Sequence, residues 1–218
     1  SSGFFPTTSM IEIENTHNRA GGAAINVSEI EAIVEIAHQS DVPVHLDGAR
    51  IFNSAVAQNI PVHELVDPVD SVTFCLSKGL SCPVGSVVCG STKFIEKARK
   101  IRKMLGGGMR QGGILAAAGI WALGNMVNRL SEDHENARKL ADHLRHIPGL
   151  EVLHDSIDTN MVYLRPLSMN TGDFLSRLKE NGVLAGASYG SIRLVTHYGI
   201  NSEDIDEVIE SILHSVKD

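Results

Sequence analysis

The chain has 218 residues, of which 43% are hydrophobic, and it carries a formal net charge of −7 at neutral pH. This length and composition predict a globular protein with one large domain or two small ones. The acidic balance argues against a nucleic-acid partner, and no apolar run in the sequence is long enough to span a membrane. The first residues, Ser1–Thr8, lack the charged and apolar segments of a signal peptide.

The chain contains three cysteines, Cys75, Cys82 and Cys89, an odd number with no CxxC pair and no histidine at zinc-site spacing. We therefore expect no metal centre. We interpret the cysteines as small buried apolar residues in a reducing compartment, which predicts a cytoplasmic location.

Strands and helices alternate through the first half of the chain. The period-two run Ser9–Glu14 predicts a strand, and a helix is expected to begin at a capping box formed by Ser28 and Glu31 and to end near Ser40. The next expected elements are a strand at Val42–Leu46, helices at Ile51–Gln58 and Val62–Leu65, and strands at Ser71–Leu76 and Ser86–Cys89. This alternation predicts an α/β fold with a mostly parallel sheet and crossover helices.

The remaining elements predict a second domain. A helix at Thr92–Met104 should turn Phe94, Ala98 and Ile101 inward, and a long apolar helix follows at Gln111–Arg129. The expected elements after that are a helix at Ser131–His146, strands at Glu151–His154 and Met161–Leu164, a helix at Gly172–Asn181, strands at Val183–Ala185 and Ile192–Thr196, and a closing helix capped by Ser202. We therefore predict a large domain over residues 1–130 and a small C-terminal α/β domain over residues 131–218.

Polar residues follow each of the first three expected strands. Asn15–Asn18 follow the first, Asp47 and Arg50 the second, and Lys78 the third. Because the carboxyl ends of parallel strands meet at one edge of a sheet, these residues should converge there. Taken singly, Lys78 could be a surface loop lysine, Asp47 could begin a turn, and His17 could be an ordinary loop histidine. Together they favour pyridoxal phosphate, which needs an amine for a Schiff base and a carboxylate to hold its ring nitrogen protonated.

Six motifs follow one another along the chain: ENTHNRAGG, HLDGARIFNSA, FCLSKGLSCPVGS, RKMLGGGMRQGGILAAAG, EDHENA and IRLVTH. In their order and approximate spacing they resemble the pyridoxal-phosphate-dependent L-threonine aldolases of the low-specificity type. That family has the aminotransferase-like fold called fold type I. The resemblance covers essentially the whole chain.

The resemblance implies roles for residues that bind the cofactor. Lys78 would form the Schiff base, with Ser77 beside it, and Asp47 would pair with the pyridine nitrogen. Arg50 would lie beside the phenolic oxygen of the cofactor and the substrate carboxylate. Arg110 follows a glycine run that matches neither a P-loop nor a dinucleotide-binding motif, and the resemblance places it near the cofactor phosphate.

The resemblance also implies a substrate and a reaction. Arg193 would bind the substrate carboxylate, and Lys103 would either lie close to the substrate pocket or be an ordinary charge at a helix C-terminus. The reaction would be retro-aldol cleavage of L-threonine or L-allo-threonine to glycine and an aldehyde, with His17 or a water molecule as base. Such an enzyme would serve threonine catabolism and glycine biosynthesis, and it would be a homo-oligomer, either a dimer or a homotetramer.

The chain departs from this family at its N-terminal end. Members are about half as long again, so we expect that an N-terminal portion is missing here, and Phe4 stands where the family usually has a histidine. Two alternatives remain open. The chain could be another pyridoxal-phosphate lyase, such as a β-eliminating lyase, or a truncated remnant without catalytic activity.

Overall fold

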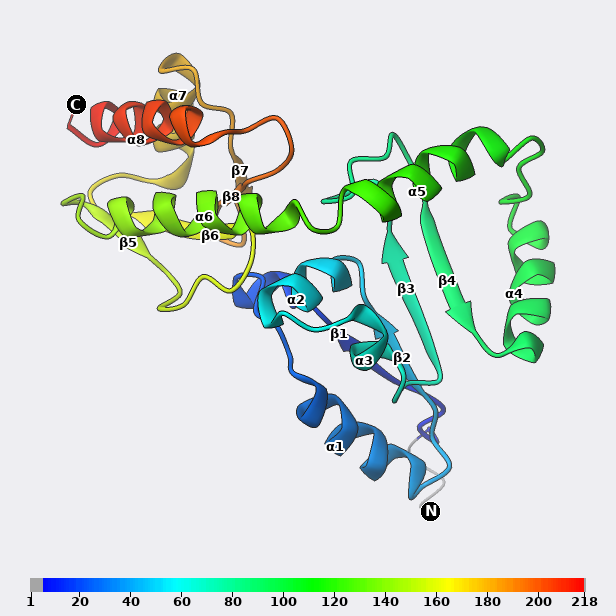
Figure 1. Ribbon diagram of the computed structural model, residues 1–218. Coiled ribbons are helices and arrows are strands. Elements are labelled where there is room, and N and C mark those ends of the chain that lie inside the picture. The colour runs from blue at the N-terminus through cyan, green and yellow to red at the C-terminus, as the bar shows by residue number, and fades with distance from the viewer. Residues whose placement is uncertain (1–5, 218) are drawn as a thin grey trace. The chain divides into compact units, whose positions relative to one another are not determined.

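The computed structural model describes residues 6–217, which form two compact units (Figure 1). The first unit extends to Thr16 and resumes over Ile25–Val127. The second unit combines His17–Ala24 with the chain from Asn128 onward. The segment His17–Ala24, which the sequence placed in the large domain, thus packs with the C-terminal residues.

The first unit is built on a four-stranded sheet with the order β1-β2-β3-β4. Strands β1, β2 and β3 are parallel, and β4 pairs with β3 in the antiparallel direction. Its elements are β1 (Ile11–Glu14), α1 (Val27–His38), β2 (Val44–Asp47), α2 (Ile51–Gln58), α3 (Val62–Val66), β3 (Ser71–Cys75), β4 (Ser86–Gly90), α4 (Thr92–Met104) and α5 (Gly113–Asn125). The predicted mostly parallel sheet with crossover helices is confirmed for this unit.

One face of this sheet is buried against α1, α2 and α3, which lie together in Figure 1. Val44 and Leu46 of β2 point into that core and are fully buried. Because side chains alternate along a strand, His45 and Asp47 lie on the other face, where both are only partly buried. The sheet therefore has an apolar face that stabilises the unit and a polar face that ends at Asp47.

Helix α1 begins two residues earlier than the sequence predicted. Its N-cap is Asn26, whose Oδ1 accepts a hydrogen bond from the Glu29 backbone N at 2.9 Å, while Glu29 Oε2 accepts one from the Asn26 backbone N at 3.0 Å. The expected cap, Ser28, lies inside the helix and donates its hydroxyl to Asn26 Oδ1 at 2.7 Å. The pairs Asn26–Glu29 and Ser28–Glu31 both have capping-box spacing. The cap forms at Asn26, whose Oδ1 accepts hydrogen bonds from both the Glu29 backbone N and the Ser28 hydroxyl.

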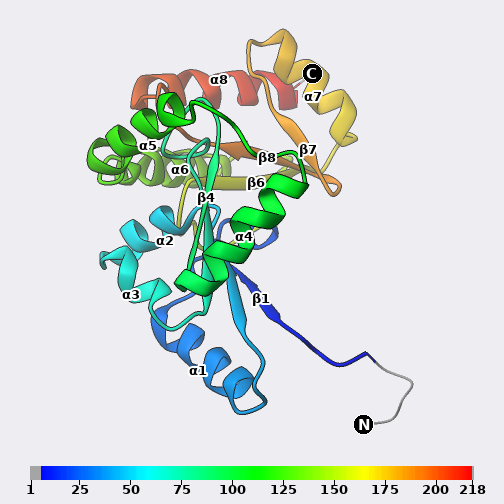
Figure 2. The ribbon, with the colours of Figure 1, turned by 90° about the vertical axis from the view of Figure 1, so that its right-hand side faces the viewer.

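The inward face predicted for α4 is wrong within the described residues. Phe94 is 39% exposed and Ile101 is 43% exposed, and α4 has no buried residue. The helix lies beside β4 in Figure 2 and presents its apolar side chains to the surface. Among residues 6–217, none of the helices is long and apolar enough to cross a bilayer.

The expectation that all three cysteines are buried is also wrong. Cys82 is buried, Cys75 is partly buried, and Cys89 is exposed on β4. Cys89 is exposed because β4 is the edge strand of the described sheet, where most of its residues are exposed.

The second unit contains an antiparallel sheet with the order β5-β6-β8-β7. Helices α6 (Leu130–Leu144), α7 (Thr171–Glu180) and α8 (Ser202–Lys217) pack on one face of it (Figure 2), and their apolar residues form a single core with the strands. Phe174, Leu164 and Ile192 are fully buried in that core. The elements are η1 (Asn18–Ala20), α6 (Leu130–Leu144), β5 (Leu150–Val152), β6 (Met161–Pro166), α7 (Thr171–Glu180), β7 (Gly186–Ser188), β8 (Ser191–Val195) and α8 (Ser202–Lys217).

Boundaries in this unit differ from the sequence prediction, most clearly at β7 and at the cap of α8. The strand predicted at Val183–Ala185 lies three residues later, because the small residues of β7 are the ones that pair with β8. Helix α8 is capped by Asn201 rather than Ser202, since Asn201 Oδ1 accepts hydrogen bonds from the backbone N of Glu203 and Asp204. Ser202 is the first residue of the helix.

Candidate active site

Asp47 is the last residue of β2 and lies between its neighbours Glu14 of β1 and Thr73 of β3. One carboxylate oxygen, Oδ1, accepts a hydrogen bond from the Ala49 backbone N at 3.0 Å, which holds the side chain at the strand end. Gly48 is required beside it. A Cβ there would lie 2.9 Å from Ile51 Cβ, closer than real Cβ atoms approach, and only 3.0 Å from the Thr73 carbonyl oxygen.

Lys78 lies in the loop that joins β3 to β4. Backbone hydrogen bonds close the loop, from Leu76 N to the Gly85 carbonyl at 2.9 Å and from Cys82 N to the Leu76 carbonyl at 3.0 Å. Leu76, Leu80 and Cys82 are buried in a small core that includes residues of α5, whereas the Lys78 side chain is exposed. A firmly anchored loop thus presents an accessible amine.

The Asp47 and Lys78 positions lie at the same edge of the sheet. Strands β2 and β3 are parallel neighbours, and the chain beyond each remains hydrogen-bonded to the other, from Gly48 N to the Thr73 carbonyl at 2.7 Å and from Cys75 N to the Ala49 carbonyl at 3.4 Å. The strands that precede these two residues therefore end at the same edge, and the convergence of their side chains stays a prediction. This is the edge at which parallel α/β sheets bind ligands.

Sequence reasoning missed His45, which shares the polar face of β2 with Asp47. Its Nδ1 lies 2.8 Å from Ser71 Oγ and its Nε2 lies 3.2 Å from Thr73 Oγ1, both on the neighbouring strand. These contacts fix the imidazole and the Thr73 side chain next to Asp47. The period-two spacing of His45 and Asp47 was the signal that could have identified it.

The other residues predicted in the first unit lie around this edge or on α4 and its following loop. Ser77 is exposed beside Lys78, and Arg50 is the N-cap residue of α2, three positions after Asp47. Lys103 lies in the last turn of α4, and Arg110 lies in the turn before α5, both exposed. The functions of these four side chains stay predictions, and Phe4 lies outside the described residues.

Asn15, one of the polar residues expected at the edge, has a structural role. Its side-chain amide accepts a hydrogen bond from the Ile25 backbone N at 3.2 Å and donates one to the Ile25 carbonyl at 2.9 Å. It thereby joins the two points where the chain leaves and re-enters the first unit.

Arg193 belongs to the second unit, on β8 directly opposite Tyr163 of β6. The neighbouring residues Ile192 and Leu194 point into the helix-covered core, so Arg193 lies on the other face of the sheet. Its Nη1 donates a hydrogen bond to Asn18 Oδ1 at 2.8 Å. Arg193 also lines a cavity of about 550 Å³ within this unit, together with Asn18 and Tyr189.

His17 also belongs to the second unit, at the start of the η1 turn. Its Nδ1 accepts a hydrogen bond from the Ala20 backbone N at 3.1 Å. In a neutral imidazole the proton then resides on Nε2. Removal of a proton by Nδ1 of His17 would therefore require the hydrogen bond from the Ala20 backbone N to break.

The sequence also matches a known protein family. Residues 1–166 match the profile of the family described as beta-eliminating lyase, which is most of the chain. The chain belongs to the beta-eliminating lyase family.

Within this family, the chain is similar to named threonine aldolases. It is 44% identical over 209 residues to low-specificity L-threonine aldolase 1 of Arabidopsis thaliana, covering 93% of this chain and 58% of the plant protein. It is 43% identical over 204 residues to the low specificity L-threonine aldolase of Escherichia coli K12, covering 94% of this chain and 59% of the bacterial protein. The resemblance seen in the motifs is confirmed, and the chain spans about 60% of the length of these relatives.

The fold is shared with a solved structure of the same kind. A candidate L-allo-threonine aldolase from Listeria monocytogenes superimposes with a TM-score of 0.80 at 20% sequence identity, over 98% of this chain and 63% of that one. This similarity confirms the predicted fold class, an α/β architecture of fold type I.

Proposed function

We propose that this beta-eliminating lyase family member belongs to a pyridoxal-phosphate-dependent enzyme that cleaves β-hydroxy-α-amino acids, L-threonine and L-allo-threonine, to glycine and an aldehyde. The observation that carries the proposal is the position of Lys78 and Asp47 at the ends of adjacent parallel strands. The names of the relatives, low-specificity L-threonine aldolases, support the choice of substrate.

The residues at this edge fit the cofactor by their chemistry. Lys78 offers an accessible amine that would bind the cofactor covalently. Asp47 keeps one oxygen on the Ala49 backbone and can direct the other at a ring nitrogen, with Thr73 and His45 packed beside it. When bound, pyridoxal phosphate supplies an electron sink for negative charge on the substrate Cα. Ser77, Arg50 and Arg110 are proposed as further cofactor contacts.

The second unit would bind the substrate carboxylate through Arg193. A guanidinium has five N–H donors, so its bond to Asn18 leaves others for a two-pronged contact with a carboxylate. Arg50 and Lys103 are proposed to assist on the side of the first unit.

The cleavage needs a base for the β-hydroxyl group. The proton leaves the hydroxyl, its oxygen becomes the carbonyl oxygen of the aldehyde, the Cα–Cβ bond breaks, and Cα gains a proton to give glycine. Because Nδ1 of His17 accepts a hydrogen bond from the Ala20 backbone N, we assign proton removal to a water molecule and keep His17 as the alternative base.

The family description favours β-elimination as a second function. That reaction would use the same Lys78 and Asp47 but would release ammonia and a keto acid. The third possibility, that the chain alone lacks activity, is tested by the same experiment.

The test is incubation of the cofactor-loaded protein with L-threonine, followed by assay of the products. Glycine and acetaldehyde in equal amounts support the proposal, whereas a keto acid and ammonia support β-elimination. Lys78→Ala should abolish either reaction, and Lys93→Ala, which changes an exposed lysine at the start of α4, should not. Absence of all products with bound cofactor would overturn the proposal.

We further propose a cytoplasmic homo-oligomer, either a dimer or a homotetramer, that serves threonine catabolism and glycine biosynthesis. The exposed apolar side chains of α4 support self-association, because exposed apolar surface favours protein contacts.

A further inference from the structure

We infer that Asn18 is a positioning residue that aims the Arg193 guanidinium for carboxylate binding. The inference rests on the proposed function for the identity of the carboxylate, an amino-acid substrate. The contact itself joins two residues 175 positions apart in the sequence, at 2.8 Å between Arg193 Nη1 and Asn18 Oδ1.

Asn18 is itself fixed by the strand that neighbours Arg193. Tyr163 pairs directly with Arg193 across β6 and β8, so the two side chains rise from the same face of the sheet. The Tyr163 hydroxyl donates to the Asn18 backbone carbonyl at 2.9 Å, and this tyrosine is 4% exposed. Adjacent residues of the sheet therefore bind the backbone and the side chain of a single asparagine.

Further contacts hold the η1 turn on this sheet. The Thr159 hydroxyl donates to the Gly22 carbonyl at 2.7 Å, and the Ala24 backbone N donates to Asp158 Oδ2 at 3.2 Å. Gly21 has a φ of 76°, and a Cβ there would lie 2.5 Å from the His154 ring. The turn is thus closely packed, and Asn18 has little freedom to follow Arg193 if the arginine moves.

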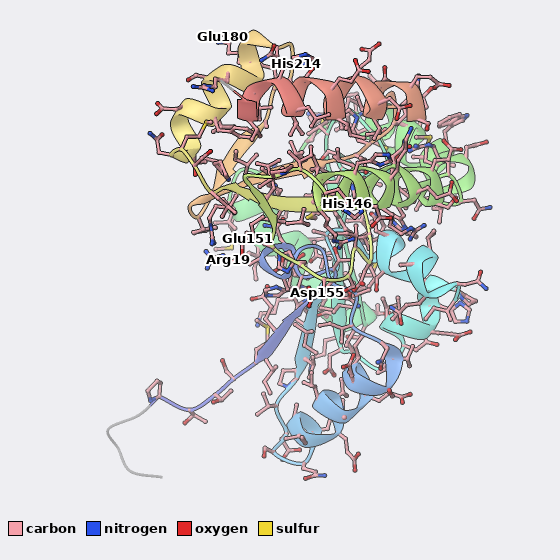
Figure 3. The ribbon with its side chains drawn as sticks, turned by 90° about the vertical axis from the view of Figure 1, so that its left-hand side faces the viewer. Arg19, His146, Glu151, Asp155, Glu180 and His214 are labelled. Atoms are coloured by element: carbon pink, nitrogen blue, oxygen red, sulfur yellow. The ribbon has the colours of Figure 1, made fainter. Side chains whose placement is uncertain are left out.

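Arg19 of the η1 turn also contacts Tyr189. The Arg19 guanidinium, labelled in Figure 3, stacks on the Tyr189 ring at 3.9 Å from the ring centre and donates a hydrogen bond to the tyrosine hydroxyl. Tyr189 lines the same cavity as Asn18 and Arg193. The positioning contact therefore lies at a cavity wide enough for a small ligand.

The neutrality of asparagine matters for this role. Its amide oxygen orients the guanidinium without cancelling the positive charge, so Arg193 remains attractive to a carboxylate. An aspartate of the same shape would hold the arginine equally well but would compete with the substrate as an anion. Asn18→Ala therefore tests whether the amide orients Arg193, and Asn18→Asp tests whether the neutrality of the amide matters.

The experiment compares both variants with a charge-matched control in steady-state cleavage of L-threonine by the cofactor-loaded chain. We expect KM to rise about 10-fold in Asn18→Ala and about 100-fold in Asn18→Asp, with kcat nearly unchanged, because a hydrogen bond to a charged group is lost or replaced by a competitor. Asn128→Asp adds the same charge at an exposed position before α6 and should leave KM unchanged. Unchanged KM in both Asn18 variants, or a loss confined to kcat, would overturn the inference.

A double-mutant cycle separates positioning from a general structural effect. In the Arg193→Lys background, Asn18→Ala should have little further effect on KM, because the guanidinium that Asn18 positions is no longer present. Additive effects would contradict the inference.

A readout that needs no catalysis keeps the test independent of the proposed function. In the full chain labelled with ¹⁵N-arginine, the Arg193 side-chain signal should be resolved and protected from exchange with solvent, and Asn18→Ala should shift it to the position of free arginine. An unchanged signal would overturn the inference even if the wild-type protein cleaves no amino acid. A shifted signal in an inactive protein would leave the positioning role intact and reject only the proposed substrate.

Discussion

Acid should destabilise the second unit through one buried histidine. His134 lies on α6 with 2% of its surface exposed, and burial, with Arg138 one turn away adding charge repulsion, lowers the pKa of His134 from its usual 6.5 to about 4. The unfolded chain therefore takes up the proton first as the pH falls. The stability that depends on neutral His134 is fully present above its unfolded pKa and is lost as the pH falls from there toward about 4.

The size of the effect follows from the shift. A pKa difference of one unit corresponds to about 1.4 kcal/mol. As the pH falls from neutral to one unit above the folded-state pKa of His134, the free energy of unfolding should therefore decrease by about 2 kcal/mol. Below the folded-state pKa the loss levels off at about 3 kcal/mol, because both states are then protonated.

Hydrogen exchange of the α6 and β6 amides measures this opening free energy within the full chain. His134→Gln should abolish most of the difference between neutral and acidic conditions, whereas His146→Gln, which changes an exposed histidine just after α6 and is labelled in Figure 3, should retain it. Equal pH dependence in wild type and His134→Gln, or a His134 imidazole signal that titrates near the usual value, would refute the reasoning.

Three further outcomes follow from the contacts. Burial is the largest single influence on Arg129 and lowers its pKa, but the hydrogen bonds and charge attraction of Asp133 and Glu132 together outweigh burial and raise the pKa of Arg129. Because Arg129→Ala would leave the fully buried Asp133 carboxylate without this partner, it should destabilise the second unit by about 3–5 kcal/mol in hydrogen exchange. Arg165→Ala, which removes an exposed pair with Glu151, should cost at most about 1 kcal/mol, and equal costs would contradict this account. His17→Asn should lower kcat less than 10-fold if water is the base, and a larger loss would restore His17 to that role. Asp47→Asn should lower kcat by at least about 100-fold, as measured by glycine release, and a change below 10-fold would exclude Asp47 as the partner of the ring nitrogen.

The local pattern of the sequence predicted the edge that holds Asp47 and Lys78. Buried strands of the first unit are short apolar runs, and parallel pairing brings the chain that follows them to one edge of the sheet. Local pattern does not distinguish between two equivalent signals. Asn26 and Ser28 both have a glutamate three residues later, and the cap predicted at Ser28 lies at Asn26.

Long-range contacts could not be predicted in this way. The assignment of His17–Ala24 to the second unit depends on Asn18 meeting Arg193 and Tyr163, residues far away in the chain. The exposure of Phe94 was missed because a helical period predicts an apolar face but not whether the described chain covers it.

The proposed function depends on Lys78 as the amine that binds pyridoxal phosphate. To test this assignment, the full chain is loaded with the cofactor, the covalent bond is reduced with borohydride, and the modified lysine is located by peptide mass spectrometry. We predict stoichiometric modification of Lys78, with exposed Lys93 unmodified. Modification of a different lysine, or none after reduction, would contradict it.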